Sequence, residues 1–332
     1  MLRMIGNTRI PAVGLGCMGM SEFYGETNDT ESLLTLQEAY ELGYRHFDTA
    51  DMYGIGHNEE LLAKFINGGS VKREAIFLAT KGGIVRDKND KYSISINTHP
   101  DYIRTACEAS LQRLKTDYID LYYLHRLDPS IPLDETLGAV SELISEGKIR
   151  QIGLCEVSAE QLQAAHTIQP IAALQSEFSL WTRDPESKIL PLCEQLGIAF
   201  VAFSPLGRGF LTGGIDKQFM DNAKSELDFR KKIPRFNAEN IDANFSLVKR
   251  LETIAQALDI STAKLALAWV LAGSPNVHII PGSKTRKHLA ANFNALHVHL
   301  APDTLCELNT IFSPEVIAGS RYPQKILDHS NA

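Results

Sequence analysis

GYRHFDTADMYGIGHNEELL, residues 43–62, combines a short apolar run, a polar loop and a helical pattern. The run YRHFD at 44–48 has the length and continuity of a strand that is buried on both faces. Residues 57–66 have the apolar spacing of an amphipathic helix. A buried strand followed by a helix is the repeating unit of a parallel α/β sheet, so this segment predicts one β-α unit.

The same unit recurs along the chain. Further strands are predicted at 10–15, 75–81, 119–125, 149–154, 171–176, 198–204 and 277–282. Further helices are predicted at 30–42, 99–114, 133–146, 159–166, 186–196, 261–272 and 285–293. Before the first barrel strand, the Gly6-Asn7 dipeptide predicts the turn of a β-hairpin. Eight strands with helices between them indicate a parallel sheet, and periodicity alone leaves both a (β/α)8 barrel and an open doubly wound sheet.

One interval interrupts this alternation. Residues 207–242, after the seventh strand, are rich in Gly, Asn, Asp, Lys and Arg and contain four phenylalanines. A long loop in a compact domain is usually a lid or a binding loop, although an insertion packed on the surface has the same composition. No linker or repeat divides the sequence, which predicts one domain over residues 1–332.

The bulk properties indicate a globular protein. The 332 residues are 44% hydrophobic and 22% charged, and the net charge of −7 gives no general attraction to nucleic acid or an anionic membrane. The sequence has no run of about 18 apolar residues and its first ten residues lack a signal-peptide pattern, so we expect a cytoplasmic protein. The five cysteines are scattered, which favours reduced thiols and predicts no metal site.

Four polar residues stand where predicted strands end. Asp48, Lys81 and His125 close the second, third and fourth strands, and Tyr53 lies in the loop after the second. In barrel enzymes the carboxyl ends of the strands surround the active site, so these side chains are expected to converge.

Their chemistry is mutually consistent. The ammonium of Lys81 would lower the pKa of Tyr53, and Asp48 would keep Lys81 charged. The imidazole of His125 would orient and polarise a substrate carbonyl. Taken singly, each has a structural explanation: a capping Asp, an aromatic plug, a lysine on the rim or a buried histidine. Their joint placement favours catalysis.

With these residues in place, the chain resembles the aldo-keto reductase superfamily over nearly its whole length. The segments 43–62, LATK at 78–81 and DLYYLHRLD at 120–128 resemble three signatures of that family. The resemblance implies a (β/α)8 barrel, a nicotinamide cofactor and a catalytic tetrad of Asp48, Tyr53, Lys81 and His125. GLGCMGMSEFYG at 14–25 and DFRKKIPRFNAEN at 228–240 are most similar to reductases related to the pyridoxal and auxin-induced enzymes.

The resemblance also assigns cofactor contacts around the same end of the barrel. It implies that Gln175 contacts the carboxamide and that Phe203 stacks on the nicotinamide ring, with Cys155 beside them. The expected contacts along the rest of the cofactor are Gly16, Cys17, Met18, Asp48, Ser204, Leu206, Gly207 and Arg208.

Residues 279–295 resemble the family segment that binds the adenosine 2′-phosphate. There the resemblance points to Ser283, Lys284, Thr285, Arg286 and His288, with Asn292 at the adenine. Backbone N–H groups at a helix start and nearby cations attract phosphate, although such a basic run is also typical of a solvated helix face. We therefore expect NADPH rather than NADH.

The chain departs from the family pattern after the fifth strand. Many relatives have Gly-Val-Ser-Asn where this sequence has Gly153-Leu154-Cys155-Glu156. A thiol is a weak hydrogen-bond partner and an ionised Glu cannot donate, so Gln175 is expected to carry more of the carboxamide contact. His288 stands where many relatives have Arg, and Ala291 where many have an acidic or amide side chain.

The predicted function is reduction of aldehydes or ketones by hydride transfer, with Tyr53 as general acid. Tyr24, Met52, Ile84 and Trp181, with Phe23 and Phe229 nearby, are candidates for an apolar substrate pocket. One alternative is a regulatory subunit that senses nucleotide redox state with little turnover, because channel β subunits resemble the same superfamily. A metal-dependent barrel hydrolase is a weaker alternative, since only Asp48 and His125 clearly qualify as ligands. The sequence leaves the oligomeric state open.

Overall fold

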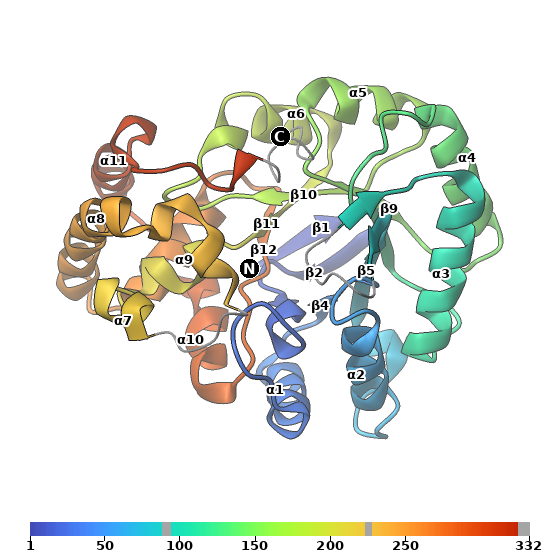
Figure 1. The fold of residues 1–332 in the computed structure, drawn as a ribbon, viewed down its shortest axis with the longest axis horizontal. Coiled ribbons are helices and arrows are strands. Elements are labelled where there is room, and N and C mark those ends of the chain that lie inside the picture. Colours follow the sequence, from blue (N-terminus) through green and yellow to red (C-terminus); the bar gives the residue numbers. More distant parts are fainter. Residues whose placement is uncertain (88–93, 223–227, 325–332) are drawn as a thin grey trace.

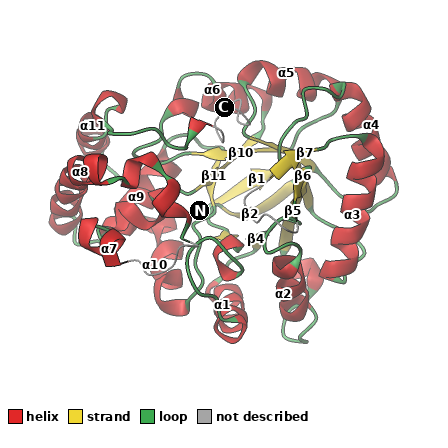
Figure 2. Cartoon of the chain, viewed as in Figure 1, coloured by secondary structure: helices red, strands yellow, loops and turns green. Residues whose placement is uncertain are grey.

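The computed structural model describes residues 1–87, 94–222 and 228–324. Its centre is a sheet of eight parallel strands in the order β12-β11-β10-β9-β8-β5-β4-β3. The strands are β3 (Leu15–Gly16), β4 (His46–Asp48), β5 (Phe77–Gly82), β8 (Leu121–Leu124), β9 (Ile152–Cys155), β10 (Ala173–Glu177), β11 (Ala199–Phe203) and β12 (Val277–Ile279). Figure 2 shows these strands surrounded by helices.

The two ends of this sheet meet. Val13 forms a parallel bridge with Ile279, and Gly16 forms one with Gly282. The N–H of Gly14 donates to the carbonyl of Ile279 at 2.8 Å. A Cβ at Gly16 would lie 2.8 Å from the carbonyl oxygen of Ile280, so glycine allows this close approach. The sheet is therefore curled, as in a (β/α)8 barrel.

Helices connect the strands on the outside (Figure 1). They are α1 (Asp29–Leu42), α2 (His57–Ile66), α3 (Pro100–Leu114), α4 (Leu133–Ser145), α5 (Ala159–Ile168), α6 (Ile189–Leu196), α7 (Lys217–Asn222), α8 (Ala238–Ala257), α9 (Thr262–Ala272), α10 (Leu289–Phe293) and α11 (Pro302–Ile311). One apolar cluster fills the barrel interior and a larger one lies mainly between the strands and these helices. Each large buried side chain contributes about 1.5–3 kcal/mol to the free energy of unfolding.

A β-hairpin covers one end of the barrel (Figure 1). Strands β1 (Leu2–Ile5) and β2 (Thr8–Pro11) pair antiparallel around a turn at Gly6-Asn7. The Arg3 guanidinium donates to backbone carbonyls just before or within β12, and the Gln151 amide donates to Asn7 and Thr8. Because Gln151 directly precedes β9, the hairpin lies at the N-terminal ends of the strands.

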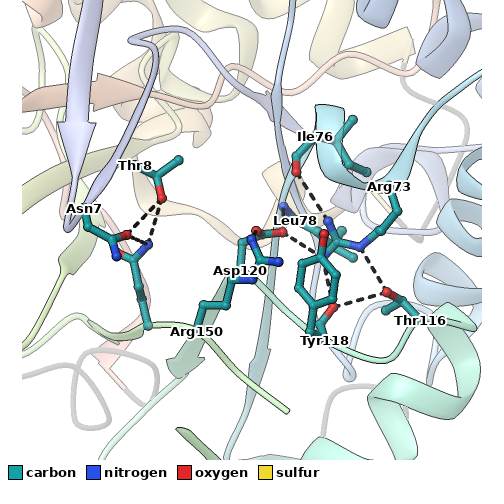
Figure 3. A network of polar contacts seen from close by, with 10 residues as sticks. Asn7, Thr8, Arg73, Ile76, Leu78, Thr116, Tyr118, Asp120 and Arg150 are labelled. Carbon is teal, nitrogen blue, oxygen red and sulfur yellow. Dashed lines mark hydrogen bonds and ion pairs between the residues drawn. The ribbon is translucent and has the colours of Figure 1, made fainter. Parts of the chain in front are cut away.

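A network of polar contacts lies at the same N-terminal end (Figure 3). Arg73 Nη2 forms an ion pair with Asp120 Oδ2 at 2.7 Å, and the same oxygen accepts the N–H of Leu78 at 3.0 Å. The guanidinium carbons of Arg73 and Arg150 lie 4.0 and 3.8 Å from the centre of the Tyr118 ring. Asp120 therefore joins the start of β5 to the segment that leads into β8.

The structure corrects parts of the sequence prediction. The run 10–15 is divided: Ile10 and Pro11 end β2, and the barrel strand β3 begins at Leu15. The reason is a change of partner, because Ala12 N–H bonds to Met1 while the Ala12 carbonyl accepts the N–H of Ile279. The predicted helix at 285–293 is a 3-10 turn, Arg286–His288, followed by α10.

The predicted loop at 207–242 is also wrong as an irregular segment. It contains α7, three 3-10 turns (Gly207–Thr212, Phe229–Lys232 and Pro234–Phe236) and the first turn of α8, while residues 223–227 lie outside the described part of the chain. Buried Phe210 and Phe236 pack against each other at 5.6 Å, which explains how a polar sequence is folded onto the barrel. Helices α8 and α11 and the strands β6 (Ile84–Arg86) and β7 (Ile94–Ile96) were not predicted.

The described residues include no single helix that is long and apolar enough to cross a membrane. Among these residues, α8 and α9 taken together have the length and apolar composition of a membrane span, but they are bent by 92° at their junction.

Candidate active site

The four predicted catalytic residues converge at the C-terminal ends of β4, β5 and β8, which we call the mouth of the barrel. Asp48 is the last residue of β4, Lys81 is the second-last residue of β5, and His125 directly follows β8. Tyr53 lies in the loop between β4 and α2. All four side chains are buried.

The ammonium of Lys81 is at the centre of this group. Its Nζ donates to Asp48 Oδ1 at 2.5 Å and to the carbonyl of Thr49 at 2.7 Å. It also lies 3.3 Å from the hydroxyl oxygen of Tyr53. The Tyr53 and His125 rings meet edge to face, with centroids 6.0 Å apart. The phenol thus stands between an ammonium and an imidazole.

Burial sets the protonation states of these groups. Burial alone would lower the pKa of Lys81, but Asp48 and then Tyr53 outweigh it and raise that pKa, so the ammonium is charged. Burial, reinforced by Lys81 and Arg126, holds the pKa of His125 well below its usual value, so the imidazole is neutral.

Tyr53 corrects one expectation. Burial raises the pKa of Tyr53 to about 12, because loss of hydration of the phenolate outweighs the lowering by Lys81. Lys81 therefore limits the rise in the pKa of Tyr53 without bringing it below its usual value. The arrangement combines a protonated phenol with a cation that stabilises its phenolate, which is the requirement for a proton donor.

Three predicted cofactor residues line neighbouring strand ends. Gln175 in β10 donates through Nε2 to Asp48 Oδ2 at 2.8 Å, so it orients the carboxylate that holds Lys81. Cys155 ends β9 opposite Gln175, and burial raises the pKa of its thiol to about 12. Phe203 ends β11, and its half-buried ring packs against the barrel interior. The thiol is neutral and the aromatic ring is at the mouth.

The segment Gly16, Cys17 and Met18 lies beside Asp48. Gly16 pairs with Asp48 across β3 and β4, and the N–H of Cys17 donates to the carbonyl of Asp48 at 2.9 Å. Cys17 is buried, while Met18 is half-buried at the start of a 3-10 turn. These residues form the wall of the mouth next to Asp48.

The segment from Ser204 to Arg208 follows β11. Ser204, Gly207 and Arg208 have φ values of 49°, 55° and 58°. The Arg208 guanidinium is committed to a buried ion pair with Glu177 at 2.8 Å. Leu206 is half-buried at the start of the Gly207–Thr212 turn. The Arg208 side chain is therefore directed to β10. The backbone of this segment is what remains for the predicted cofactor contacts.

The predicted phosphate segment lies beside the loop before α1. Lys284 Nζ donates to the carbonyls of Tyr24 and Glu26 at 2.7 and 2.8 Å. Arg286 forms an ion pair with Glu31 at 3.1 Å. Of the remaining predicted contacts, the Ser283 hydroxyl donates to the Thr285 carbonyl at 2.7 Å, His288 is exposed and Asn292 is buried.

The predicted substrate residues fall into two groups. Tyr24, Met52 and Ile84 lie in segments next to Tyr53: the Met52 carbonyl accepts a hydrogen bond from Arg86 at 3.1 Å, and buried Ile84 starts β6. Trp181 instead stacks on Phe210 at 4.6 Å and is 2% exposed, so it supports the segment after β11 from beneath. A Cβ at Gly207 would lie 2.6 Å from the Trp181 ring.

Glu156 is buried with a φ of 51°. Its Oε1 accepts the N–H of Glu177 at 2.8 Å, and its Oε2 lies 3.0 Å from Arg321. Glu156 therefore ties the end of β9 to the C-terminal segment.

Sequence reasoning missed three residues at the mouth. Thr49 contributes through its backbone carbonyl, for which side-chain patterns give no signal. Arg86 binds both Glu22 oxygens at 2.7 Å and reaches the loop of Tyr53. Arg126 lowers the pKa of His125, and its position directly after that histidine was a signal available in the sequence.

A family model matches most of the chain. The model described as the aldo/keto reductase family matches residues 12–311. The chain is 40% identical over 325 residues to the NADP(+) aldo-keto reductase yakc of Schizosaccharomyces pombe, covering 97% of this chain and 94% of that protein. It is 41% identical over 321 residues to the probable aldo-keto reductase 1 of Glycine max, covering 96% and 90%.

Solved structures show the same architecture. A glycerol dehydrogenase from Gluconobacter oxydans superimposes with a TM-score of 0.84 at 27% identity, covering 94% of this chain and 96% of that chain. An aldo/keto reductase from Klebsiella pneumoniae, solved with NADP and acetate, gives 0.72 at 27% identity, covering 97% and 98%.

Proposed function

The chain belongs to the aldo/keto reductase family, and from that membership we propose that it reduces aldehydes or ketones to alcohols with NADPH, using Tyr53 as general acid. The observation that carries the proposal is the position of the Tyr53 hydroxyl, 3.3 Å from the Lys81 ammonium and beside the neutral imidazole of His125. We further propose that residues 1–332 form one barrel domain.

The protein residues supply the proton and fix the substrate. Tyr53 donates its phenolic proton to the substrate oxygen as negative charge develops there, and Lys81 stabilises the phenolate that remains. Asp48 keeps Lys81 charged and in place. His125, being neutral, can donate an N–H to the substrate oxygen without competing as an acid. When bound, NADPH supplies the hydride for the carbonyl carbon.

The structure offers groups that fit this cofactor. Lys284 has its pKa lowered by burial and then by the neighbouring cation Arg230, so an anionic phosphate beside these two residues would be stabilised. The half-buried ring of Phe203 lies at the end of β11, and the amide of Gln175, in the neighbouring β10, donates to Asp48. We propose that Lys284 and Arg230, together with Ser283, Thr285, Arg286 and His288, hold the adenosine phosphate end. We propose that Phe203 and Gln175 hold the nicotinamide.

Apolar groups near Tyr53 suggest the class of substrate. Phe23 and Phe229 contact each other at 5.8 Å, and the N–H of Phe229 donates to the carbonyl of Phe23. The guanidinium carbon of Arg86 lies 5.8 Å from the centre of the Phe23 ring, and Arg86 donates to the Met52 carbonyl, so this pair is linked to the loop that carries Tyr53. We propose that aromatic and medium-chain aldehydes are preferred over small polar ones.

The test is a carbonyl panel followed by NADPH oxidation, with NADH in parallel. We expect turnover with NADPH, and we expect Tyr53→Phe to lower kcat by about 10²–10⁴-fold while nucleotide binding is retained. Tyr118→Phe is the matched control, because this tyrosine lies at the N-terminal end of the barrel. Turnover by Tyr53→Phe close to that of the unmodified protein would show that another group donates the proton.

A further inference from the structure

The loop that carries Tyr53 has a conformation that needs support. Gly54, Ile55 and Gly56 have φ values of 58°, 54° and 91°, and Ile55 is half exposed. A left-handed conformation is sterically unfavourable for a residue with a β-branched side chain. Contacts from outside the loop must therefore hold Tyr53 in position.

Asn58, near the start of α2, makes these contacts. Its backbone N–H donates to the carbonyl of Tyr53 at 3.2 Å. Its side-chain Oδ1 accepts the hydroxyl of Thr49 at 2.6 Å. Its Nδ2 donates to the carbonyl of Cys17 at 2.9 Å and to Ser21 Oγ at 2.8 Å. Asn58 is fully buried and uses both amide protons, so its side-chain orientation is determined.

These contacts reach the catalytic ammonium from two sides. Thr49, held by the Asn58 side chain, provides the carbonyl that accepts a hydrogen bond from Lys81 at 2.7 Å. Tyr53, held by the Asn58 backbone, places its hydroxyl 3.3 Å from the same Nζ atom. We propose that Asn58 is a positioning residue that fixes the distance between Lys81 and Tyr53, an inference that rests on the proposed function.

The far side of Asn58 is anchored to the protein surface. Ser21 Oγ lies 2.8 Å from His57 Nδ1, and His57 Nε2 lies 3.2 Å from Asp29 in α1. Since Ser21 Oγ accepts a hydrogen bond from Asn58, the Ser21 hydroxyl can donate its own hydrogen to His57. The His57 and Asp29 side chains are 37% and 41% exposed, so this outer part should matter less than the buried Asn58 and Thr49.

Loss of the Asn58 side chain has a distinctive kinetic consequence. A less fixed Lys81 lowers the pKa of Tyr53 less effectively, so that pKa rises. The phenolate that remains after proton transfer is then less stabilised, so the chemical step slows. Because the proton donor is misplaced while the binding surfaces remain, kcat falls more than KM rises.

The experiment compares Asn58→Ala with Asn67→Ala. The side chain of Asn67, at the other end of α2, donates only to the Ala63 carbonyl among the described residues, so its variant controls for loss of a helix hydrogen bond. We expect Asn58→Ala to lower kcat about 10–100-fold, to change KM by less than about threefold and to accelerate amide exchange in residues 50–58. Asn67→Ala should leave kcat and this amide exchange unchanged.

Thr49→Val provides a second test that keeps the shape of the side chain and the backbone carbonyl. We expect a several-fold fall in kcat in the same direction, and a double variant with Asn58→Ala that is less impaired than the product of the two single effects. This variant decides the matter if Asn58→Ala does not fold.

A loss of thermal stability in Asn58→Ala and Thr49→Val, with kcat within twofold of that of the unmodified protein, would overturn the proposal. The unmodified protein separates this result from failure of the proposed function. If it does not reduce any carbonyl with NADPH, the proposed function fails; if it turns over and these variants match it, only the role of Asn58 fails.

Discussion

The two ends of the barrel use the same kind of buried ion pair for different purposes. At the mouth, Lys81 pairs with Asp48 and shares its remaining protons with a backbone carbonyl and the Tyr53 hydroxyl. At the N-terminal end, Arg73 pairs with Asp120 and also donates to the carbonyl of Tyr118 at 2.9 Å (Figure 3). The Lys81–Asp48 pair contacts the Tyr53 hydroxyl, which can give up a proton. The Arg73–Asp120 pair instead contacts backbone groups, the Thr116 hydroxyl, the Tyr118 ring and a second cation, Arg150, which lies 3.5 Å from Asp120.

This difference indicates how the fold separates stability from activity. In barrels the C-terminal ends of the strands carry the chemistry, and the opposite end stabilises the structure. Here Arg73 lies in the 3-10 turn just before β5, and Lys81 lies near the end of the same strand. Substitutions at the two sites should therefore separate stability from turnover within one structural element.

The largest effect is expected at the N-terminal end. Arg73→Met leaves Asp120 without its principal partner in a buried position, so the free energy of unfolding should fall by about 3–5 kcal/mol. Urea unfolding measures this loss, and kcat should stay within twofold. Arg104→Met, which removes an exposed ion pair with Glu142, should cost less than about 1 kcal/mol. An equal loss in both variants would contradict a special role for Arg73.

The reciprocal change is at the mouth. Lys81→Met removes the cation that stabilises the Tyr53 phenolate, so kcat should fall at least about 100-fold. Single-turnover NADPH oxidation measures the chemical step. Lys148→Met, which removes a surface lysine paired with Glu108, should leave kcat unchanged. If Lys81→Met loses less than about tenfold, the mouth pair is mainly structural, as at the other end.

The sequence predicted the central strands and the mouth well because both depend on local signals. Short apolar runs bounded by polar residues mark buried parallel strands, and Asp48, Lys81 and His125 stand where such runs end. The assignment to the aldo-keto reductases is confirmed by the family match over residues 12–311. The catalytic and cofactor roles of individual residues stay predictions.

Other features depend on long-range contacts that a single sequence does not display. Asn58 is an ordinary helix residue until Thr49, Cys17 and Ser21 are placed around it. Arg208 carries charge suited to a phosphate, yet its partner is Glu177 on another strand. Helix α8 was missed for a different reason: its buried Ile241, Val248 and Leu251 have helical spacing, but the surrounding polar residues resembled a loop.

Asp51, in the loop between β4 and α2, offers a test of whether the mouth also lowers the free energy of unfolding. Burial, and then the nearby Glu59, raises the pKa of Asp51 from 3.8 to about 8. The folded state therefore binds the proton more tightly than the unfolded state. This contribution is complete below about pH 4 and is lost as the pH rises to about 8.

Asp51→Asn removes this titration while keeping the shape of the side chain. The variant should gain up to about 1.4 kcal/mol per pH unit relative to the unmodified protein between pH 5 and 8. Urea unfolding across that range measures the gain. Asp101→Asn, at a side chain 92% exposed, should not gain. A difference between Asp51→Asn and the unmodified protein that does not vary with pH would contradict the shifted carboxyl.

The smallest effect concerns His46, in the N-terminal half of the barrel. Its contribution to stability depends on pH in the opposite direction to that of Asp51. Burial, and then Lys81, lowers the pKa of His46 from 6.5 to about 3, and neither ring nitrogen has a hydrogen-bond partner among the described residues. Below pH 6.5 His46 binds a proton in the unfolded chain, whereas in the folded chain it stays neutral down to about pH 3. The contribution of His46 to stability is thus present above pH 6.5 and lost as the pH falls toward 3.

Urea unfolding at pH 6.5 and 5.5 should therefore show a smaller loss in His46→Leu than in the unmodified protein, by up to about 1 kcal/mol. His299→Leu, which removes an exposed imidazole, should keep the original dependence. If His46→Leu loses as much stability as the unmodified protein on acidification, this histidine is protonated in the fold. In that case acid sensitivity would have to come from elsewhere, beginning with buried His278, whose pKa burial also lowers to about 3.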